Sequence, residues 1–196
     1  MKITNLTVDS TLYTSNVFLV QGTWNSIEDI NTLVDVGSDI RIIKKIESIN
    51  TGLGKNKVDQ VILTHCHSDH SAILEDIRTA FRPRIYAFNS HLKRIDHILR
   101  DGDTLKIGEH QFEVIHLTFH SYDSVCLYCE AEAILFAGDT TFPVIGGNEA
   151  LMRENEKALG RLLGKDIKTV YPGHGPVQHF NEKKFMLMKE SKIESG

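Results

Sequence analysis

VDQVILTHCHSDHS, residues 58–71, places three histidines and an aspartate within the six positions from His65 to His70. The apolar run before them predicts a strand over 58–64 that is buried on both faces. Imidazole and carboxylate groups crowded into the loop after such a strand gain nothing from burial. Neutral imidazoles and carboxylates are, however, the ligands that transition metals take in proteins. The stretch therefore predicts a metal site.

Four more polar residues follow predicted strands elsewhere in the chain. Asp35 ends TLVDVG, His120 follows FEVIHLTF, Asp139 ends AILFAGD, and His174 lies in YPGHG after IKTVY. Each of them alone is typical of a cap or turn. Open sheets carry their sites at the edge where strands end, so together these residues predict convergence on the 65–70 loop.

The local spacing divides the central cluster into two parts. His65 and His67 alternate in an extended segment, so both can face one ion, whereas Asp69 and His70 enter the next helix and can face a second. His120 and His174 can each supply a third imidazole, and the two oxygens of the Asp139 carboxylate could bridge the ions. Such a site keeps open positions for water, which is typical of catalytic rather than structural zinc.

The composition fits one soluble globular unit over 1–196, with 41% hydrophobic residues and a net charge of −4. This weak acidity argues against nucleic acid or an anionic membrane as the main partner and leaves a small-molecule substrate as the expected one. The sequence carries no signal for oligomeric state.

The compartment expected from the sequence is the cytoplasm. The first residues lack the apolar segment of a signal peptide, and no stretch reaches the length of a transmembrane helix. Three cysteines, an odd number, fit a reducing compartment.

The predicted elements mix strands and helices along the whole chain. Strands are expected over 3–8, 12–20, 32–36, 58–64, 84–88, 112–117, 124–129, 133–138 and 167–171. Helices are expected from a Ser38 cap to Thr51-Gly52, over 70–81, around Leu92, Ile95, Ile98 and Leu99, and over 148–163 and 181–193. This order favours an α+β fold of two mixed sheets with helices outside.

The HxHxDH stretch and the polar strand ends resemble the metallo-β-lactamase superfamily over about residues 12–178. The resemblance implies a four-layer αβ/βα sandwich with a dinuclear site between the sheets. It implies one position formed by His65, His67 and His120, a second by Asp69, His70 and His174, Asp139 as the bridge, and Asp35 as a residue that supports the ligand loop.

THCHSDH, LFAGDT and YPGHGP are most similar to the short glyoxalase II-like hydrolases of that superfamily. The similarity implies that a metal-bound hydroxide attacks a small acyl substrate, a thioester in the first place or a lactone, with Asp69 holding the nucleophile. Two zinc ions per chain are expected, although histidine and aspartate also suit iron and manganese.

The chain departs from those hydrolases around the pocket. Ser71 and Ala72 replace the usual glycines, Thr118-Phe119 replaces Pro-Gly, and Asp123 replaces another glycine. These changes remove backbone freedom. The chain also leaves no room for the helical domain with which true glyoxalase II binds glutathione, so a glutathione thioester is not the default substrate.

An oxidoreductase is the alternative reading of the same motif. Persulfide dioxygenase-like members keep HxHxDH but hold one iron, which here would bind His65, His120 and Asp139. The identity and number of the metal ions separate the two hypotheses.

Overall fold

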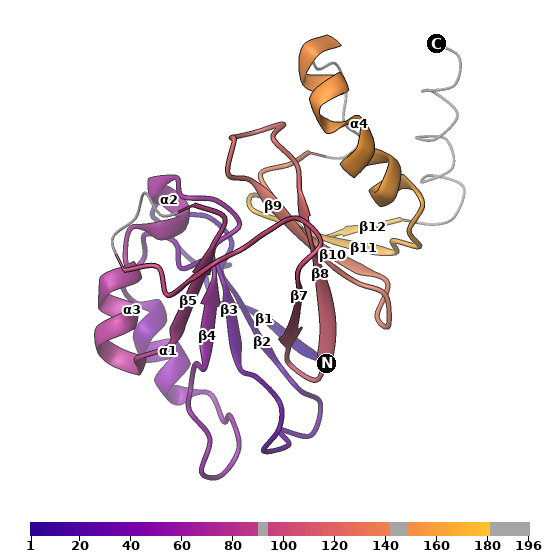
Figure 1. Cartoon of the computed structure of the whole chain (residues 1–196). Coiled ribbons are helices and arrows are strands. Elements are labelled where there is room, and N and C mark those ends of the chain that lie inside the picture. The colour runs from indigo at the N-terminus through magenta and orange to yellow at the C-terminus, as the bar shows by residue number, and fades with distance from the viewer. Residues whose placement is uncertain (90–93, 142–148, 181–196) are drawn as a thin grey trace.

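The first sheet is formed by the N-terminal half of the chain (Figure 1). The computed structural model describes residues 1–89, 94–141 and 149–180. In spatial order the strands are β1 (Lys2–Asn5), β2 (Phe18–Gln21), β3 (Thr32–Val34), β4 (Gln60–Ile62), β5 (Arg84–Ala87) and β6 (His97–Ile98). The pairs β1–β2 and β2–β3 are antiparallel, and the pairs from β3 to β6 are parallel.

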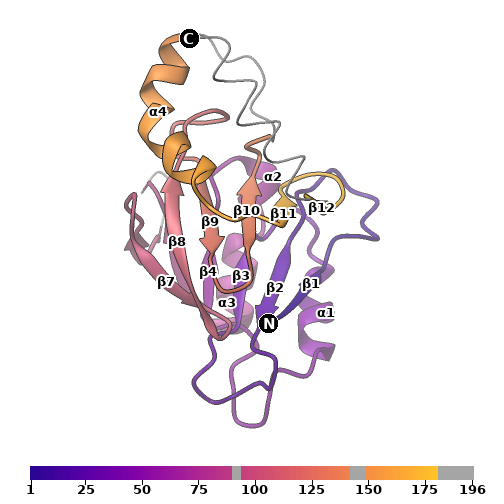
Figure 2. The ribbon, with the colours of Figure 1, turned by 90° about the vertical axis from the view of Figure 1, so that its right-hand side faces the viewer.

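The second sheet faces the viewer in Figure 2. Its spatial order is β12 (Gln178–His179), β11 (Thr169–Pro172), β10 (Ile134–Gly138), β9 (Val125–Cys129), β8 (His110–His116) and β7 (Thr104–Ile107). Only the pair β10–β11 is parallel. Both sheets are therefore mixed, as the sequence predicted.

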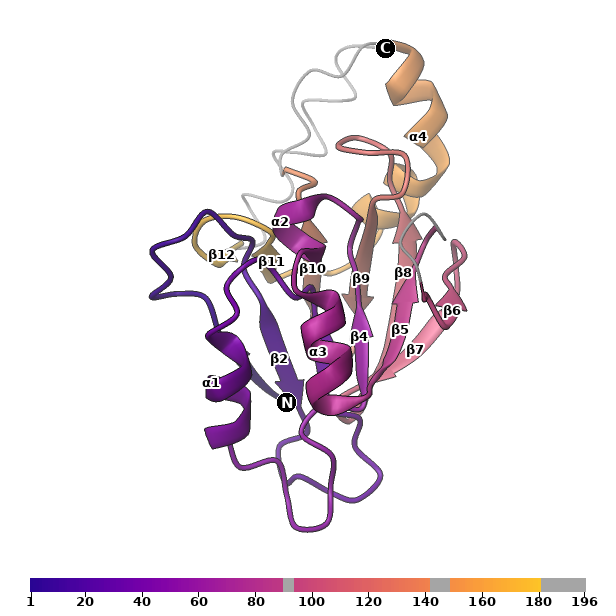
Figure 3. The same ribbon diagram turned by 90° about the vertical axis from the view of Figure 1, so that its left-hand side faces the viewer.

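Helices cover the outer faces of the two sheets. Helices α1 (Ile42–Ser48) and α3 (Leu74–Phe81) lie in front of the first sheet in Figure 3, and the single turn α2 (Ser68–Ser71) lies above α3. Helix α4 (Glu149–Leu163) packs on the second sheet through Leu159 and Leu162. None of the helices in the described ranges is long and apolar enough to span a membrane.

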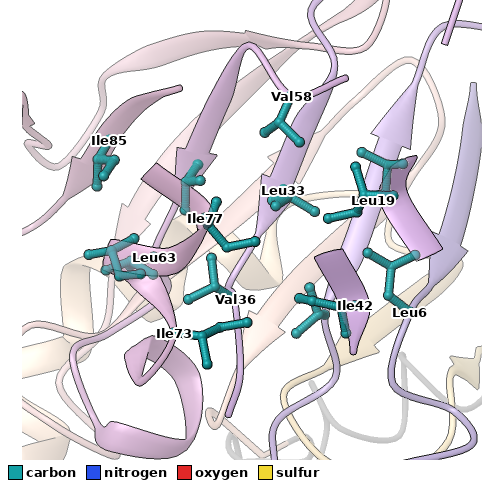
Figure 4. Close-up of a cluster of buried hydrophobic side chains, with 14 of the residues drawn as sticks. Leu6, Leu19, Leu33, Val36, Ile42, Val58, Leu63, Ile73, Ile77 and Ile85 are labelled. Carbon is teal, nitrogen blue, oxygen red and sulfur yellow. The ribbon is translucent and has the colours of Figure 1, made fainter. Parts of the chain in front are cut away.

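Three clusters of buried apolar side chains fill the spaces between these four layers. The cluster in Figure 4 joins the first sheet to α1 and α3, with Leu33 and Leu63 facing Ile42 and Ile77. A second cluster lies between the sheets, and a third lies between the second sheet and α4. The predicted αβ/βα sandwich is confirmed.

The strand directions bring the polar strand ends to one edge of each sheet. Strands β3 and β4 are parallel, so Asp35 and His65 follow at the same end of the first sheet. In the second sheet β8, β10 and β11 run the same way, so His120, Asp139 and His174 follow at one end. The Val125 N–H donates to the Thr64 carbonyl oxygen at 2.8 Å and joins these two ends.

The short helix expected around Leu92 to Leu99 is wrong in its described part. Residues 90–93 lie outside the described residues, and His97–Ile98 forms β6. The Asp96 N–H donates to the Ile85 carbonyl at 2.9 Å, and the Leu99 N–H donates to the Ala87 carbonyl at 2.8 Å. These bonds to the edge of β5 outweigh the apolar periodicity of the segment.

The helix expected over 70–81 is broken into α2 and α3. The Val36 and Gly37 N–H groups both donate to the His70 carbonyl oxygen, at 2.9 and 3.0 Å. In a continuous helix the Leu74 N–H would donate to this His70 carbonyl. Because the carbonyl already accepts two N–H groups from another segment, the helix is interrupted and α3 begins at Leu74.

Two other boundaries differ because side chains bond across the fold. Ser38 does not cap α1: its hydroxyl donates to the Tyr13 carbonyl at 2.7 Å, and α1 begins at Ile42. The strand expected over 12–20 spans only Phe18–Gln21. Before it, the Ser15 N–H donates to the Asp69 carbonyl in α2, and the Asn16 N–H donates to the Gly173 carbonyl in the second half of the chain.

The sequence analysis did not predict strands β7 and β12. The helix expected over 181–193 lies outside the described residues.

Replacing Phe136 by alanine tests the packing between the sheets. Phe136 is 1% exposed, and its ring lies 5.5 Å from Phe18 and 5.1 Å from Tyr171 between centroids. The truncation is expected to lower the free energy of unfolding of the metal-free protein by about 3–5 kcal/mol in urea titrations. Val8→Ala, at an 81% exposed position, is the control and should change it by less than about 0.5 kcal/mol. A Phe136→Ala variant as stable as the wild type would contradict this inner layer.

Candidate metal centre

The first group of predicted ligands consists of three histidines from both halves of the chain. His65, His67 and His120 each offer one nitrogen, and these nitrogens all lie within 4.8 Å of one another. His120 Nε2 lies 2.9 Å from His67 Nδ1, and the rings of His65 and His67 stand edge to face at 4.6 Å between centroids. Three imidazoles converging in this way form a set of ligands suited to one transition-metal ion.

The second group consists of Asp69, His70 and His174. Their ligand atoms also lie within 4.8 Å of one another. His174 Nε2 is 3.0 Å and His70 Nε2 is 3.9 Å from Asp69 Oδ2. Two imidazoles and a carboxylate can likewise hold one ion.

Asp139 lies between the two groups. Its Oδ2 is 3.6 Å from Nε2 of both His120 and His174, and its Oδ1 is 3.2 Å from His70 Nε2. One carboxylate thus reaches a histidine of the first group and two of the second. This is the placement that a bridging ligand between two ions requires.

Three buried ligand atoms make no hydrogen bond of good geometry in the described part of the chain: His65 Nε2, and the pair His70 Nε2 and Asp139 Oδ1, which lie 3.2 Å apart. A buried polar atom without a partner costs about 1–3 kcal/mol. All three atoms belong to one group of possible ligands. A bound cation would satisfy them together, so these residues fit a dinuclear metal site.

The Asp35 carboxylate contacts the loop that carries the candidate ligands. Its carboxylate accepts the Thr64 N–H at 2.8 Å and the Thr64 hydroxyl at 2.9 Å, and its Oδ2 lies 2.9 Å from His70 Nδ1. The contact at Nδ1 leaves His70 Nε2 facing the ligand groups. Asp35 has a φ of 60°, a left-handed conformation that this set of contacts stabilises.

Charge inside the centre is balanced among the same residues. Burial lowers the pKa of His70, but the Asp35 and Asp139 carboxylates outweigh it and raise the pKa to about 10. Burial and the neighbouring His70 lower the pKa of His65 to about 4. Burial raises the pKa of Asp139, but His70 outweighs it and brings the pKa to about 2. Without a metal ion, His70 therefore carries the positive charge opposite two carboxylates.

Asn16 fixes the loop that carries His174, a role that the sequence analysis missed. Its backbone N–H donates to the Gly173 carbonyl at 2.6 Å, and its side-chain amide donates to the Pro172 and Gly175 carbonyls at 2.9 and 2.8 Å. Asn16 lies inside the segment 12–20 that the sequence predicted as a strand, and nothing in that pattern indicated contacts more than 150 residues away in sequence.

The wall beside His174 is partly aromatic. The Tyr13 ring stacks on the His174 ring with 5.5 Å between centroids, and Tyr13 remains 81% exposed. A small cavity of about 190 Å³, open to solvent, borders the centre at His120, Asp139 and His174, with Thr140, Thr141 and Gln178 among its other lining residues.

Two mixed sheets between outer helices, with histidine and aspartate groups at one end of the seam, define an αβ/βα protein with a candidate dinuclear metal centre. The chain belongs to the metallo-beta-lactamase superfamily, whose family profile matches residues 10–97 and 87–174. The fold implied by the resemblance in the sequence is thereby confirmed, whereas the ligand roles of the individual residues stay predictions.

Curated relatives are hydroxyacylglutathione hydrolases. A protein of Schizosaccharomyces pombe named probable hydroxyacylglutathione hydrolase is 33% identical over 130 residues, which are 61% of this chain and 50% of the relative. The hydroxyacylglutathione hydrolase of Francisella tularensis subsp. tularensis is 31% identical over 132 residues, 62% of this chain and 52% of the relative. The matches thus span about half the length of these relatives.

Solved structures with the same fold are more distant in sequence. ETHE1 from Myxococcus xanthus has a TM-score of 0.70 at 19% identity and covers 94% of this chain and 82% of its own. TTHA1623 in a di-iron-bound form has a TM-score of 0.66 at 21% identity and covers 91% and 94%. These similarities support the fold.

Replacing Gly173 by alanine tests the space that the centre requires. A Cβ at this position would lie 2.1 Å from Asp139 Oδ1 and 2.8 Å from His70 Cε1, closer than real contacts allow. Gly173→Ala is therefore expected to weaken zinc binding at least about tenfold in chelator competition. Gly160→Ala in α4, where nothing lies within 4 Å, is the matched control and should bind zinc like the wild type. Equal zinc affinities of the two variants would show that zinc binding does not depend on the present positions of Asp139 and His70.

Proposed function

We propose that the chain is a dinuclear metal-dependent hydrolase that acts on a small acyl substrate, a thioester in the first place. The observation that carries this proposal is the position of Asp139 between two complete ligand groups, within 3.6 Å of a histidine in each. A structural zinc site is closed and rich in cysteine. Here the ligands are histidine and aspartate, and a cavity opens beside them.

Two zinc ions per chain are the proposed occupants. His65, His67 and His120 would hold one ion, and Asp69, His70 and His174 the other, with Asp139 shared. When bound, such ions supply Lewis acidity, which lowers the pKa of water toward 7 and polarises a carbonyl group.

Asp69 is the proposed catalytic carboxylate. Its side chain is 17% exposed, and its Oδ2 lies 3.0 Å from His174 Nε2. Asp139 faces histidines of both groups, and Asp35, at 3% exposure, is engaged by Thr64 and His70. Asp69 is thus the carboxylate assigned to orient a water molecule toward the substrate carbonyl and to accept its proton.

The names of the curated relatives favour a thioester over a lactone. The solvent-open cavity beside His120 and His174 would receive the small acyl group, and the exposed Tyr13 ring, stacked on His174, offers an apolar surface next to that histidine. The matches cover only about half of each relative, so the names of the relatives do not define the thiol part of the substrate for this chain. A glutathione thioester and a simple alkyl thioester with the same acyl group are therefore the first pair to compare.

The alternative is a one-iron oxidoreductase that uses His65, His120 and Asp139. It leaves His67, Asp69, His70 and His174 without a ligand role, although their ligand atoms lie in the same two groups. Because the one-iron members also keep HxHxDH, the metal content separates the two hypotheses. Elemental analysis of protein purified without added metal measures this content. About two zinc ions per chain would support the hydrolase, and one iron ion per chain would support the oxidoreductase and contradict the hydrolase.

Asp69→Ala is expected to lower kcat/KM for thioester hydrolysis by about 100-fold or more at saturating zinc, because the variant loses a ligand and the proposed proton acceptor. Its far-UV circular dichroism spectrum should match that of the wild type. Asp76→Ala, an exposed aspartate on α3, is the matched control and should keep full activity. Undiminished hydrolysis by Asp69→Ala would rule out the two-metal mechanism.

A further inference from the structure

We propose that Asp123 is a positioning residue that sets the metal affinity of the first position, formed by His65, His67 and His120, separately from that of the second. The inference rests on the proposed dinuclear function. Asp123 occupies the position at which the short glyoxalase II-like hydrolases have a glycine.

The Asp123 carboxylate lies buried in the loop between β8 and β9, at 4% exposure. Its Oδ2 accepts the Cys66 N–H at 3.0 Å and the Asn89 side-chain amide at 3.1 Å. Its Oδ1 accepts the Ser121 hydroxyl at 2.7 Å. These donors come from three different loops and are all uncharged. A glycine at 123 could make none of these contacts.

Two of these donors are direct neighbours of the first group of ligands. Cys66 lies between His65 and His67, and Ser121 follows His120. The loop of Ser121 is closed further by Ser124, whose hydroxyl accepts the Ser121 N–H at 3.1 Å. The Asp123 carboxylate therefore joins two loops. One loop follows the first sheet and carries His65 and His67, and the other follows β8 of the second sheet and carries His120.

Burial raises the pKa of Asp123, but the hydrogen bonds from Ser121 and Cys66 outweigh it and lower the pKa. The group is therefore a carboxylate at neutral pH. Hydrogen bonds to an ionised acceptor are roughly twice as strong as those to a neutral one. The charged acceptor therefore holds the loop of Cys66 and the loop of Ser121 at one fixed distance from each other.

The second metal position is held by other contacts. His70 Nδ1 lies 2.9 Å from Asp35, the Ser15 N–H donates to the Asp69 carbonyl at 3.0 Å, and Asn16 fixes the loop of His174. Asp123 makes none of these contacts. Loss of its side chain should therefore loosen one position and leave the other intact.

The test measures two zinc dissociation constants per chain by competition with a chromophoric chelator, in the wild type and in Asp123→Ala. Supporting contacts around metal ligands typically contribute 10–100-fold to affinity. Asp123→Ala is expected to weaken one constant by that factor and to change the other by less than about threefold. Thermal unfolding of the metal-free variant checks that it folds.

Asp123→Asn is the conservative variant. Its amide oxygen can still accept the Cys66 N–H and its amide group can donate to the Ser121 hydroxyl, so it should restore most of the affinity. Asn16→Ala is the matched variant at the other loop and should weaken the other constant. Asp166→Asn, at an exposed site on the far end of the second sheet, should change neither.

A His120→Ala background assigns the affected position. Because this change removes a ligand of the first position, adding Asp123→Ala should no longer weaken the constant that remains. Equal weakening of both constants by Asp123→Ala, or no change in either, would overturn the proposal. A wild-type chain that binds one ion would overturn the dinuclear function instead; weakening of that single constant by Asp123→Ala would still support the positioning role.

Discussion

Packing of the two sheets through their inner apolar layer positions the whole metal centre, because both proposed metal positions take ligands from both sheets. Phe18 and Ile62 of the first sheet lie in one cluster with Phe112 and Phe136 of the second. None of these four residues is a candidate ligand. A change in the distance between the sheets would nevertheless separate His65 from His120 and His70 from His174. The hydrophobic effect thus fixes the geometry within which the polar contacts of the site form.

Polar contacts then set the fine position of each ligand loop at the seam. The Val125 N–H donates to the Thr64 carbonyl and Asp123 accepts the Cys66 N–H. Asn16 donates to the Pro172, Gly173 and Gly175 carbonyls in the loop of His174. The centre also concentrates buried polar atoms that have no hydrogen-bond partner among the described residues. Metal binding and stability of this edge are therefore coupled, because an ion that satisfies those atoms binds the folded state and not the unfolded chain.

The sequence predicted the convergence of the polar side chains better than the elements between them. These candidate ligands could be selected because imidazoles and carboxylates directly after apolar strands have no role in packing, and because parallel strands end on one side of a sheet. The break between α2 and α3 could not be predicted, since it depends on two N–H groups from residues 36 and 37 that bond to the His70 carbonyl. The same holds for Asn16, whose partners lie at the other end of the chain. Local periodicity describes a segment by itself, whereas these features depend on what the folded chain brings beside it.

The distribution of ligands along the chain has a consequence for the order of events during synthesis. The first four predicted ligands lie within residues 65–70, but His120 completes one group and His174 the other. A nascent chain that has only its first sheet can therefore offer three imidazoles and a carboxylate on one loop, without the geometry of either position. Tight capture of metal must await the arrival of the second sheet, because His120 follows β8 and His174 follows β11. Metal loading would thus follow the pairing of the two sheets and not precede it.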